Sequence, residues 1–163
     1  MRKIPLFLFF IFLAYIIPAI YFLDKHCFLC PIEYKRGIII RSDRWGEGVF
    51  AAPRRGQRVH NGVDLFAEVG TPVLASRSGK VVIATNQEKG MGLYVVISHS
   101  GGLSTLYGHL SKILVEKNGF VRQGDVIGFV GKTGNADAPE MQPHLHFEIR
   151  NNGFLEDPLN YLR

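Results

Sequence analysis

Two short histidine motifs lie far apart in this 163-residue sequence, His60-x-x-x-Asp64 and His144-x-His146. His109 lies between them, so that four of the six histidines fall at three places in the chain. Imidazole nitrogens and a carboxylate oxygen are typical ligands of a catalytic zinc ion, and spare histidines can transfer protons. The histidine pattern therefore predicts a catalytic metal site.

The pair His144-x-His146 is suited to a β-strand. Side chains two positions apart on a strand share a face, so His144, His146 and Glu148 would project together while the apolar residues between them face the core. Pro143 favours an extended backbone at the entrance to this strand. Taken alone, the pattern also fits a surface strand with incidental histidines.

The first motif can supply the remaining ligands. Asn61-Gly62 allows a tight turn, so that the side chains of His60 and Asp64 can converge on one point. With one histidine of the later pair they form a set of two nitrogens and one oxygen. Structural zinc sites usually have four protein ligands, whereas three leave a position for water. The set is therefore typical of catalytic zinc, although spacing alone does not assign the third ligand.

Short strands are the elements expected to position these residues. The 18 glycines and eight prolines lie between short apolar runs, and no segment after residue 40 has helical periodicity over three turns. Ser100-Gly101-Gly102 is typical of a hairpin and Gly70-Thr71-Pro72 of another turn. The sequence therefore predicts a single all-β domain. Its expected strands include residues 81–84, 93–98, 103–107, 126–130 and 145–149.

The N-terminal segment has a different composition. After Arg2 and Lys3, residues 4–23 are twenty uncharged, mainly apolar positions, enough for a helix of roughly 30 Å. We expect residues 1–23 to be a membrane anchor, with a cleaved signal peptide as the alternative. In both cases the basic N-terminus favours an extracytoplasmic location for the rest of the chain.

Charge and cysteine content restrict the possible partners. The net charge is +5, but no basic run is interleaved with aromatic residues, so nucleic acid is not an expected partner. Cys27 and Cys30 are the only cysteines of the sequence, and we favour a local disulfide over a redox pair or half of a metal site. Residues 24–37 are expected to be a linker and residues 38–163 the folded domain.

Three segments carry a resemblance to a known family. They are His60-Asn61-Gly62-Val63-Asp64, Tyr107-Gly108-His109-Leu110-Ser111 and Pro143-His144-Leu145-His146-Phe147-Glu148. In this order they resemble the zinc-dependent peptidoglycan endopeptidases of the lysostaphin and LytM type, the M23 peptidase family. The resemblance covers about residues 38–162. It implies a compact antiparallel β-sheet domain with a substrate groove that crosses the metal.

The resemblance also implies a role for each residue. His60, Asp64 and His146 match the ligands of zinc (Zn2+), while His109 and His144 match the two catalytic histidines. Zinc lowers the pKa of its bound water toward about 7 and polarises the scissile carbonyl. His109 would accept the proton of this water, and His144 would stabilise the oxyanion or protonate the leaving amine.

The implied function is hydrolysis of peptide bonds in peptidoglycan stem peptides or crosslinks by a metalloendopeptidase of the bacterial cell envelope. The expected partners are a peptidoglycan peptide and, through the N-terminal segment, the membrane. The alternatives are a non-catalytic M23-fold activator, a glycan-binding module and a membrane-tethered scaffold. All five residues implied in the site are intact, which favours an enzyme.

Two segments depart from the family pattern. Several members carry a tyrosine a few residues before the first ligand, where this chain has Arg54, Arg55 and Arg58. An arginine can act as a cationic stabiliser of an oxyanion, and the other interpretation is a solvated basic loop. Residues 135–142 form a longer lead into His144 than is usual. They either line the groove or form a surface insertion.

Overall fold

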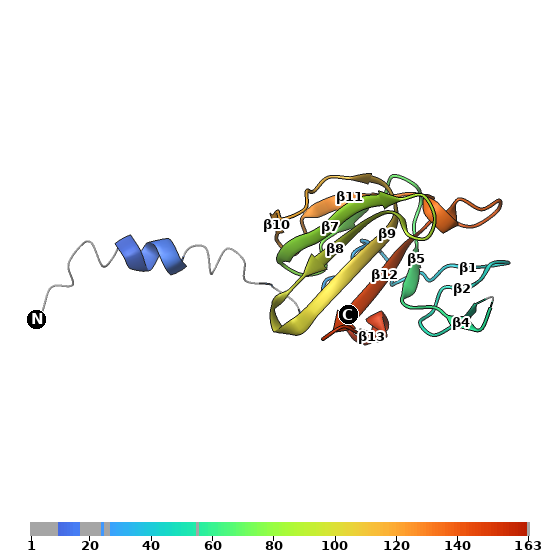
Figure 1. The fold of residues 1–163 in the computed structure, drawn as a ribbon, viewed down its shortest axis with the longest axis horizontal. Coiled ribbons are helices and arrows are strands. Elements are labelled where there is room, and N and C mark those ends of the chain that lie inside the picture. Colours follow the sequence, from blue (N-terminus) through green and yellow to red (C-terminus); the bar gives the residue numbers. More distant parts are fainter. Residues whose placement is uncertain (1–9, 17–23, 25–26, 55, 163) are drawn as a thin grey trace, which may run out of the picture.

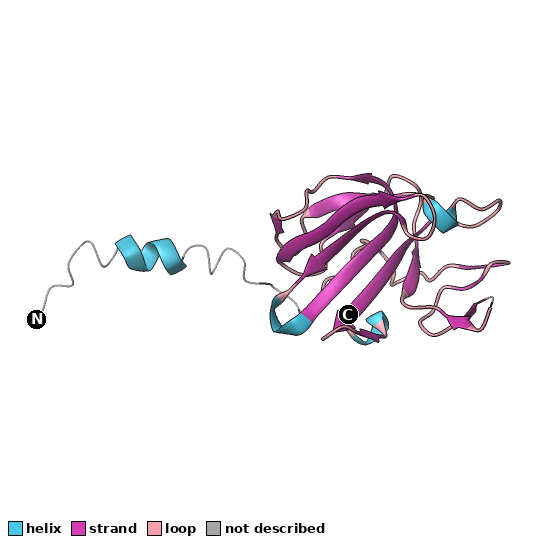
Figure 2. Ribbon diagram, in the orientation of Figure 1, coloured by secondary structure: helices cyan, strands magenta, loops and turns pink. Residues whose placement is uncertain are grey.

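The computed structural model describes residues 10–16, 24, 27–54 and 56–162 of the chain. Residues 10–16 form a short helix, and the domain that follows is built mainly from strands (Figures 1 and 2). The strands are β1 (Ser42–Asp43), β2 (Gly46–Glu47), β3 (Pro53–Arg54), β4 (Arg58–Val59), β5 (Val63–Phe66), β6 (Pro72–Leu74), β7 (Gly79–Gln87), β8 (Gly92–Ser98), β9 (Leu103–Ile113), β10 (Phe120–Val121), β11 (Val126–Val130), β12 (His144–Asn151) and β13 (Phe154–Glu156). Three short 3-10 turns accompany them, namely η1 (Ser100–Gly102), η2 (Gly134–Ala136) and η3 (Pro158–Asn160). The predicted all-β class is therefore confirmed.

One antiparallel sheet forms the body of the domain. Six of its nine strands follow the order β10-β7-β8-β9-β11-β6, while β12 pairs with β9, β5 and β13. Two small hairpins, β1–β2 and β3–β4, lie outside this sheet. The five predicted strands are all present, as β7, β8, β9, β11 and β12. The predicted hairpin is confirmed as well, because η1 joins β8 to its partner β9.

β9 changes its partner along one edge. Its first part pairs with β12 as far as Gly108, and its last part pairs with β11 from Leu110 onward. His109 lies between these two regions, where the register with β8 also shifts. Its φ of 62° is in the left-handed region, which costs a residue other than glycine about 1 kcal/mol or more. The sheet therefore forks at His109.

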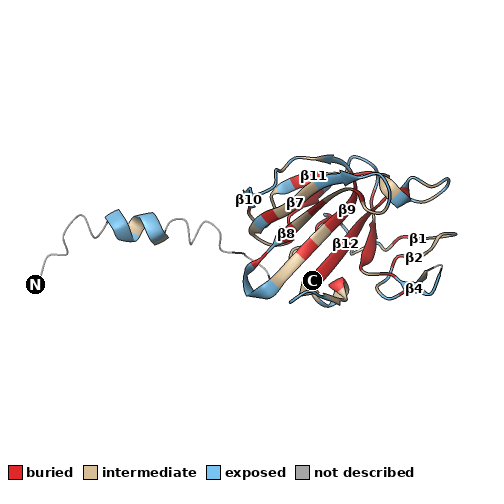
Figure 3. Cartoon of the chain, viewed as in Figure 1, coloured by how far each residue is buried: buried red, intermediate tan, exposed pale blue. Residues whose placement is uncertain are grey.

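Both faces of β12 are buried. Leu145, Phe147 and Ile149 are fully buried in the hydrophobic core, as the alternation of the sequence predicts. The opposite face carries His144, His146 and Glu148, which are each at most 4% exposed. Figure 3 shows buried residues along β12 and its neighbour β5. The polar residues of β12 therefore lie inside the protein, where they need partners.

The segment before the sheet packs on the domain more extensively than a linker would. Phe28 and Ile32 belong to the core, and the hydroxyl of Tyr34 donates a hydrogen bond to the carbonyl of Phe66 at 2.8 Å. Cys27 is exposed, Cys30 is half-buried and both are free thiols, so the expected disulfide is not present. Part of the expected linker, residues 24–37, is thus folded against the sheet.

The expected anchor or signal peptide, residues 1–23, lies largely outside the described residues, which include only 10–16 of it. Among the described residues, no helix is long and apolar enough to cross a membrane.

Gly62 allows β5 to lie close to β12. A Cβ atom at this position would lie 2.2 Å from the carbonyl oxygen of Phe147, a separation that real structures do not tolerate. The φ of Gly62 is not in the left-handed region, in contrast to the φ values of eleven other glycines. Gly62 is therefore required by close approach of two backbones, and not by the tight turn that the sequence suggested.

We predict that Gly62→Ala lowers the free energy of unfolding by about 2 kcal/mol or more, because β5 and β12 must separate. Gly101→Ala is the matched control, since its Cβ would meet no atom within 4 Å and only its φ of 77° is unfavourable. The control should lose about 1 kcal/mol. Urea unfolding of the metal-free protein measures both, and equal losses would contradict the close-approach argument.

Candidate active site

The register between β5 and β12 brings the two histidine motifs together. Asp64 lies directly opposite His146 in this antiparallel pair, and His60 lies just before β5. The carboxylate Oδ1 of Asp64 is 2.9 Å from His146 Nδ1 and 3.0 Å from His60 Nε2. The two ring nitrogens are also 3.0 Å apart. Residues separated by more than eighty positions in the sequence thus present three donor atoms to one point.

The orientation of each imidazole is fixed by its other nitrogen. His60 Nδ1 donates to the carbonyl oxygen of Val49 at 2.9 Å, and His146 Nε2 donates to Glu148 Oε1 at 3.2 Å. Because a carbonyl or carboxylate oxygen can only accept, these bonds direct one N–H group of each ring away from the cluster. The other nitrogens are left facing one another, as in metal sites whose histidine ligands are held by outer hydrogen bonds.

Asp64 divides its two oxygens between the cluster and two arginines. Its Oδ2 accepts from Arg41 Nη2 at 2.9 Å and from Arg54 Nη2 at 3.3 Å, while Oδ1 faces the histidines. Burial alone would raise the pKa of Asp64, but its contacts with His146 and His60 hold that pKa well below its ordinary value. Asp64 is therefore a carboxylate with one oxygen oriented toward the cluster.

The donor set fits a zinc ion. His60, Asp64 and His146 are buried, and their ligand atoms lie within 4.8 Å of one another. Tetrahedral ligands at zinc distances are about 3.3 Å apart, so the donors need to separate by only a few tenths of an ångström. Burial lowers the pKa of His146, but hydrogen bonds to Asp64 and Glu148 outweigh it and raise that pKa to about 9. In the metal-free protein, protonated His146 therefore supplies the positive charge that a metal ion would supply when bound.

His109 and His144 lie beside this cluster. The centroids of their rings are 5.0 Å apart, and the His109 centroid is 5.9 Å from that of His146. His109 Nδ1 donates to the carbonyl of Thr133 at 2.9 Å, and His144 Nδ1 donates to the carbonyl of Gln142 at 2.7 Å. The Nδ1 proton of each ring is thus directed away from the cluster, and in the neutral ring Nε2 is the acceptor.

The electrostatic surroundings keep both of these rings neutral. Burial, followed by the nearby His144 and His146, lowers the pKa of His109 to about 3. Burial is also the main cause that lowers the pKa of His144. His109 and His144 can therefore accept a proton at neutral pH without first losing one.

A cavity of about 880 Å³ lies over the cluster. Its lining residues are Arg41, Trp45, Pro53, Arg54, Gln57, Arg58, Val59, His60, Asn61, Asp64, Gly90, Met91, His109, Asn135, Ala136, Met141, His144 and His146. All five residues implied by the family resemblance are in this lining.

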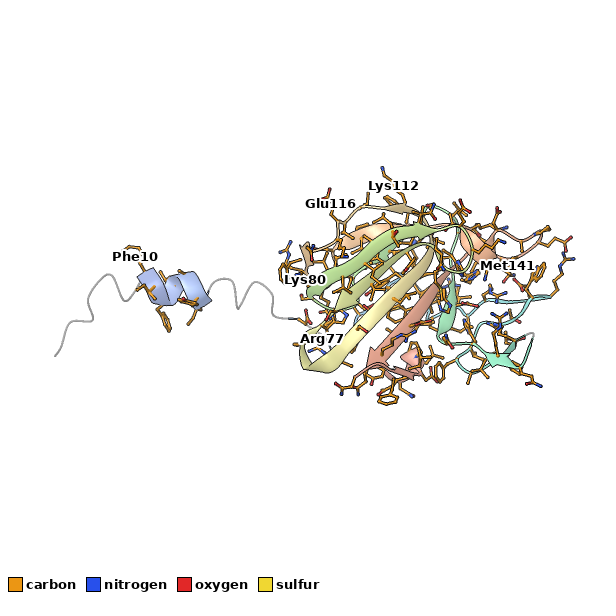
Figure 4. All side chains as sticks on the ribbon, viewed as in Figure 1. Phe10, Arg77, Lys80, Lys112, Glu116 and Met141 are labelled. Carbon is orange, nitrogen blue, oxygen red and sulfur yellow. The ribbon has the colours of Figure 1, made fainter. Side chains whose placement is uncertain are left out.

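The long lead into β12 contributes to the cavity and is not only a surface insertion. Met141 of this segment lines the cavity. Figure 4 labels it at the end of the domain that lies away from the N-terminal helix. The carbonyl of Pro139 accepts a hydrogen bond from Trp45 Nε1 at 3.0 Å, and Glu140 pairs with Arg44 at 2.7 Å. The β1–β2 hairpin thus supports this side of the cavity.

Sequence reasoning missed two groups of the site. Arg41 contacts Asp64 from a segment without any motif, so only the folded structure brings it into view. Thr133 orients His109 through its carbonyl, while its hydroxyl donates to the carbonyl of Leu110 at 2.8 Å. Glu148 was placed correctly on the face of the histidines, but its contact with His146 was not anticipated.

The structure thus combines an antiparallel β-sheet domain with a buried His-Asp-His cluster and two further histidines that line the same cavity. The model of peptidase family M23 matches residues 58–158, and the chain belongs to this family, whose members depend on zinc. The lysostaphin-type fold and the family expected from the sequence are thus confirmed.

Relatives and solved structures agree with this assignment. The DD-carboxypeptidase/endopeptidase Mpg of Neisseria meningitidis serogroup B is 45% identical over 103 residues, which cover 63% of this chain and 23% of that protein. The chain thus spans about a quarter of the length of this curated relative. The catalytic domain of lysostaphin from Staphylococcus simulans has a TM-score of 0.63 at 34% sequence identity. The matched region covers 74% of this chain and 97% of the lysostaphin chain. A zinc-containing peptidase from Vibrio cholerae has a TM-score of 0.57 at 30% sequence identity. The matched region covers 82% of this chain and 36% of the peptidase chain.

We predict that Glu148→Ala weakens zinc binding by about ten- to a hundredfold, because His146 then loses the group that orients its ring. Competition with a fluorescent chelator measures the affinity, and circular dichroism checks the fold. Glu156→Ala, a change of the same kind on β13, serves as the control and should leave the affinity unchanged. Equal affinity of wild type and Glu148→Ala would contradict the orienting role.

Zinc binding is predicted to strengthen as pH rises. His146 carries a proton below its pKa of about 9 in the metal-free protein, and this proton must leave before Nδ1 can act as a ligand. The apparent affinity should therefore increase by about tenfold per pH unit between roughly pH 6.5 and 8. Calorimetry in two buffers with different ionisation enthalpies should detect the release of about one proton. A pH-independent affinity in this range would show that His146 is already neutral.

Proposed function

We propose that this chain is a zinc-dependent endopeptidase that hydrolyses peptide bonds of peptidoglycan, in stem peptides or in crosslinks. His60, Asp64 and His146 would hold the metal, and His109 and His144 would handle protons. Membership of the M23 family supports peptidase activity, and a relative is named as a DD-carboxypeptidase/endopeptidase. The donor set of two imidazoles and one carboxylate supports zinc.

The residues of this chain define the proton path. Zinc, when bound, supplies a Lewis acid that lowers the pKa of water and polarises a peptide carbonyl. His109 Nε2 would accept the proton of the attacking water, while the Nδ1 proton of that ring stays on the ring and is donated to the carbonyl of Thr133. The C–N bond then breaks, and the protonated ring returns its proton to the leaving nitrogen. The products are a carboxylic acid and an amine, and at neutral pH the remaining proton of the water passes from the acid to the amine or to solvent.

His144 begins as a second proton acceptor. Its Nδ1 proton is committed to the carbonyl of Gln142, so its Nε2 can donate to an oxyanion or an amine only after it has received a proton. The carboxylate Oδ1 of Asp64 lies 3.8 Å from this Nε2 and would stabilise the resulting imidazolium. This arrangement gives His144 a donor role late in the reaction.

The arrangement of His109 and His144 is the observation that carries the proposal. A module that only binds glycan or activates another enzyme gains nothing from two neutral imidazoles beside three metal ligands. Left-handed backbone at His109 has a cost in free energy, and such strain is typical of catalytic positions. The strained His109 and the two neutral imidazoles therefore favour an enzyme over a non-catalytic M23-fold activator or a membrane-tethered scaffold.

We also propose that the domain, residues 38–163, acts on the extracytoplasmic side of the bacterial cell envelope. The uncharged segment that follows Arg2 and Lys3 supports delivery across the membrane, as an anchor or as a cleaved signal. Peptidoglycan lies on that side, so substrate and catalytic domain would meet there.

The function is tested by incubating the full chain with purified peptidoglycan, with and without a chelator, and identifying released fragments by mass. We expect fragments with new amine and carboxylate ends that disappear with chelator and return with added zinc. Fragments released equally with and without chelator would contradict a metal-dependent mechanism, and no release from a zinc-loaded protein would favour the non-catalytic alternative.

Two variants separate metal binding from proton transfer. His109→Ala should keep its zinc and lose activity by at least about a hundredfold, since it removes only a proton acceptor. His60→Ala should lose the metal as well as the activity. Zinc content by atomic emission and turnover on peptidoglycan measure the two effects. Wild-type turnover in a zinc-free His60→Ala protein would refute the proposal.

A further inference from the structure

Asp43 joins two parts of the site that lie far apart in the sequence. Its side chain is 8% exposed and is not among the described residues of the cavity lining. Its Oδ1 accepts hydrogen bonds from Arg41 Nη1 at 2.5 Å and from the backbone N–H of Trp45 at 2.8 Å. Its Oδ2 accepts from the backbone N–H of Gln142 at 3.0 Å. One carboxylate thus contacts both the β1–β2 hairpin and the segment that leads into β12.

Arg41 connects Asp43 to a proposed metal ligand. The side chain of Arg41 is 3% exposed, and its Nε and Nη2 donate to Asp64 Oδ2 at 3.3 and 2.9 Å. A guanidinium group is planar, and its N–H donors have a fixed geometry. The hydrogen bond from Nη1 to Asp43 therefore also sets the direction of the two bonds to Asp64.

Asp43 carries the charge that this contact requires. Burial alone would raise the pKa of Asp43, but hydrogen bonds from Arg41 and from the backbone N–H groups of Gln142 and Trp45 lower that pKa. Asp43 is therefore a carboxylate whose negative charge offsets the positive charge of buried Arg41.

Gln142 connects the same carboxylate to His144. Its N–H donates to Asp43 Oδ2, and its carbonyl accepts from His144 Nδ1 at 2.7 Å. Pro143 follows, and a residue before proline favours extended backbone. Because few conformations are open to Gln142, a hydrogen bond at its N–H also fixes the direction of its carbonyl. That carbonyl holds the Nδ1 proton of His144, so that Nε2 faces Asp64 at 3.8 Å.

The segment before β12 needs such contacts to keep its shape. Figure 1 shows this segment, in orange, and the β1–β2 hairpin extending from the same end of the domain. Glu140 has left-handed backbone with a φ of 61°, which is unfavourable for a residue other than glycine. Its ion pair with Arg44 joins side chains that are 72% and 56% exposed, and such pairs contribute little. Among the described hydrogen bonds between hairpin and segment, the one to Asp43 is made by the residue closest to His144.

We propose that Asp43 is a positioning residue that orients Asp64 through Arg41 and His144 through Gln142. The kinetic part of this inference rests on the proposed peptidase function, because His144 handles protons only in that reaction. Without the carboxylate the carbonyl of Gln142 has no fixed direction, and the His144 ring can rotate and carry its proton on either nitrogen. Asp43 thus affects catalysis without touching substrate or metal.

The test compares variants that break one link or both. Asp43→Asn has nearly the same shape but only one acceptor oxygen. That oxygen should face Arg41, because a charged donor forms the stronger hydrogen bond, so the amide NH2 meets the N–H of Gln142 and this link is lost. Asp43→Ala loses both links. Glu47→Ala is the matched control, since it removes a carboxylate of the same hairpin that accepts a hydrogen bond from Ser42.

The position of the proton on His144 is the direct readout. Long-range proton–nitrogen NMR spectra of the isotope-labelled, zinc-free full chain, at a pH where the ring is neutral, show which ring nitrogen carries the proton. The signal is assigned by its loss in His144→Gln. We expect the proton on Nδ1 in wild type and Glu47→Ala, and both tautomers in Asp43→Asn and Asp43→Ala. Circular dichroism establishes that each variant is folded.

Kinetics and zinc affinity give the second readout. On soluble crosslinked peptides from peptidoglycan, zinc-loaded Asp43→Asn should lose kcat by about tenfold or more with KM within about twofold of wild type, because a catalytic group is displaced while substrate contacts remain. Asp43→Asn should keep its zinc affinity, whereas Asp43→Ala should weaken it by about tenfold, since Arg41 loses the group that directs it to Asp64. Glu47→Ala should match wild type in kcat, KM and zinc affinity.

The outcomes separate the positioning role from the function. A fall in kcat with the His144 proton still on Nδ1 would overturn the link through Gln142, and wild-type kcat in both Asp43 variants would overturn the positioning role. So would an equal loss of kcat in Glu47→Ala, since damage to the hairpin would then explain both. Mixed tautomers in Asp43→Asn, with no cleavage by the wild-type protein, would support the positioning of His144 and overturn the proposed function instead.

Discussion

The pairing of Asp64 with His146 across β5 and β12 is the constraint on which the site depends. The residues are direct partners in the register, and their side-chain atoms meet at 2.9 Å. A slip of one residue would turn His146 toward the core and bring Leu145 or Phe147 to the cluster. Gly62 protects this register, because any side chain there would collide with the backbone of β12. The close packing of β5 on β12 and the alignment of Asp64 with His146 thus depend on the same register.

The fork in the sheet solves a second problem, which is to bring a histidine of β9 to the same cluster. Gly108 lies opposite His146, and a Cβ at Gly108 would lie 3.2 Å from the sulfur of Met91 and 3.5 Å from the Cβ of His146. A regular strand would continue past this point with its alternation intact. Instead, the left-handed residue His109 redirects the chain from β12 to β11, and its backbone N–H donates to the carbonyl of Met91 at 2.8 Å. The local strain is offset by two hydrogen bonds that His109 donates, from its backbone N–H to Met91 and from its Nδ1 to Thr133.

The sequence predicted what depends on local pattern. Alternation along β12 predicted which side chains face the core, and runs bounded by glycine predicted the longer strands. The packing of Phe28 and Ile32 on the core was not predicted, because a short apolar segment next to a membrane-like run has no period of its own. Arg41 was missed for a related reason, since its role arises from a contact 23 residues away in the sequence. The role of Glu148 needs a structure too, because a shared face does not imply a shared hydrogen bond.

The contacts around the cluster form a chain of alternating charge. Arg41 contacts Asp64, Asp64 contacts His146, His146 contacts Glu148, and Glu148 pairs with Arg150 at 2.8 Å. Buried charges are tolerated only when each has a partner of opposite sign, and here every member between the two arginines has two. A proton on His146 completes the alternation without metal. A metal ion next to Asp64 preserves it, because one cation then replaces another. The fold can therefore hold the three ligand residues in place before a metal ion binds. The free-energy cost of ordering these side chains is then part of folding and not of metal binding.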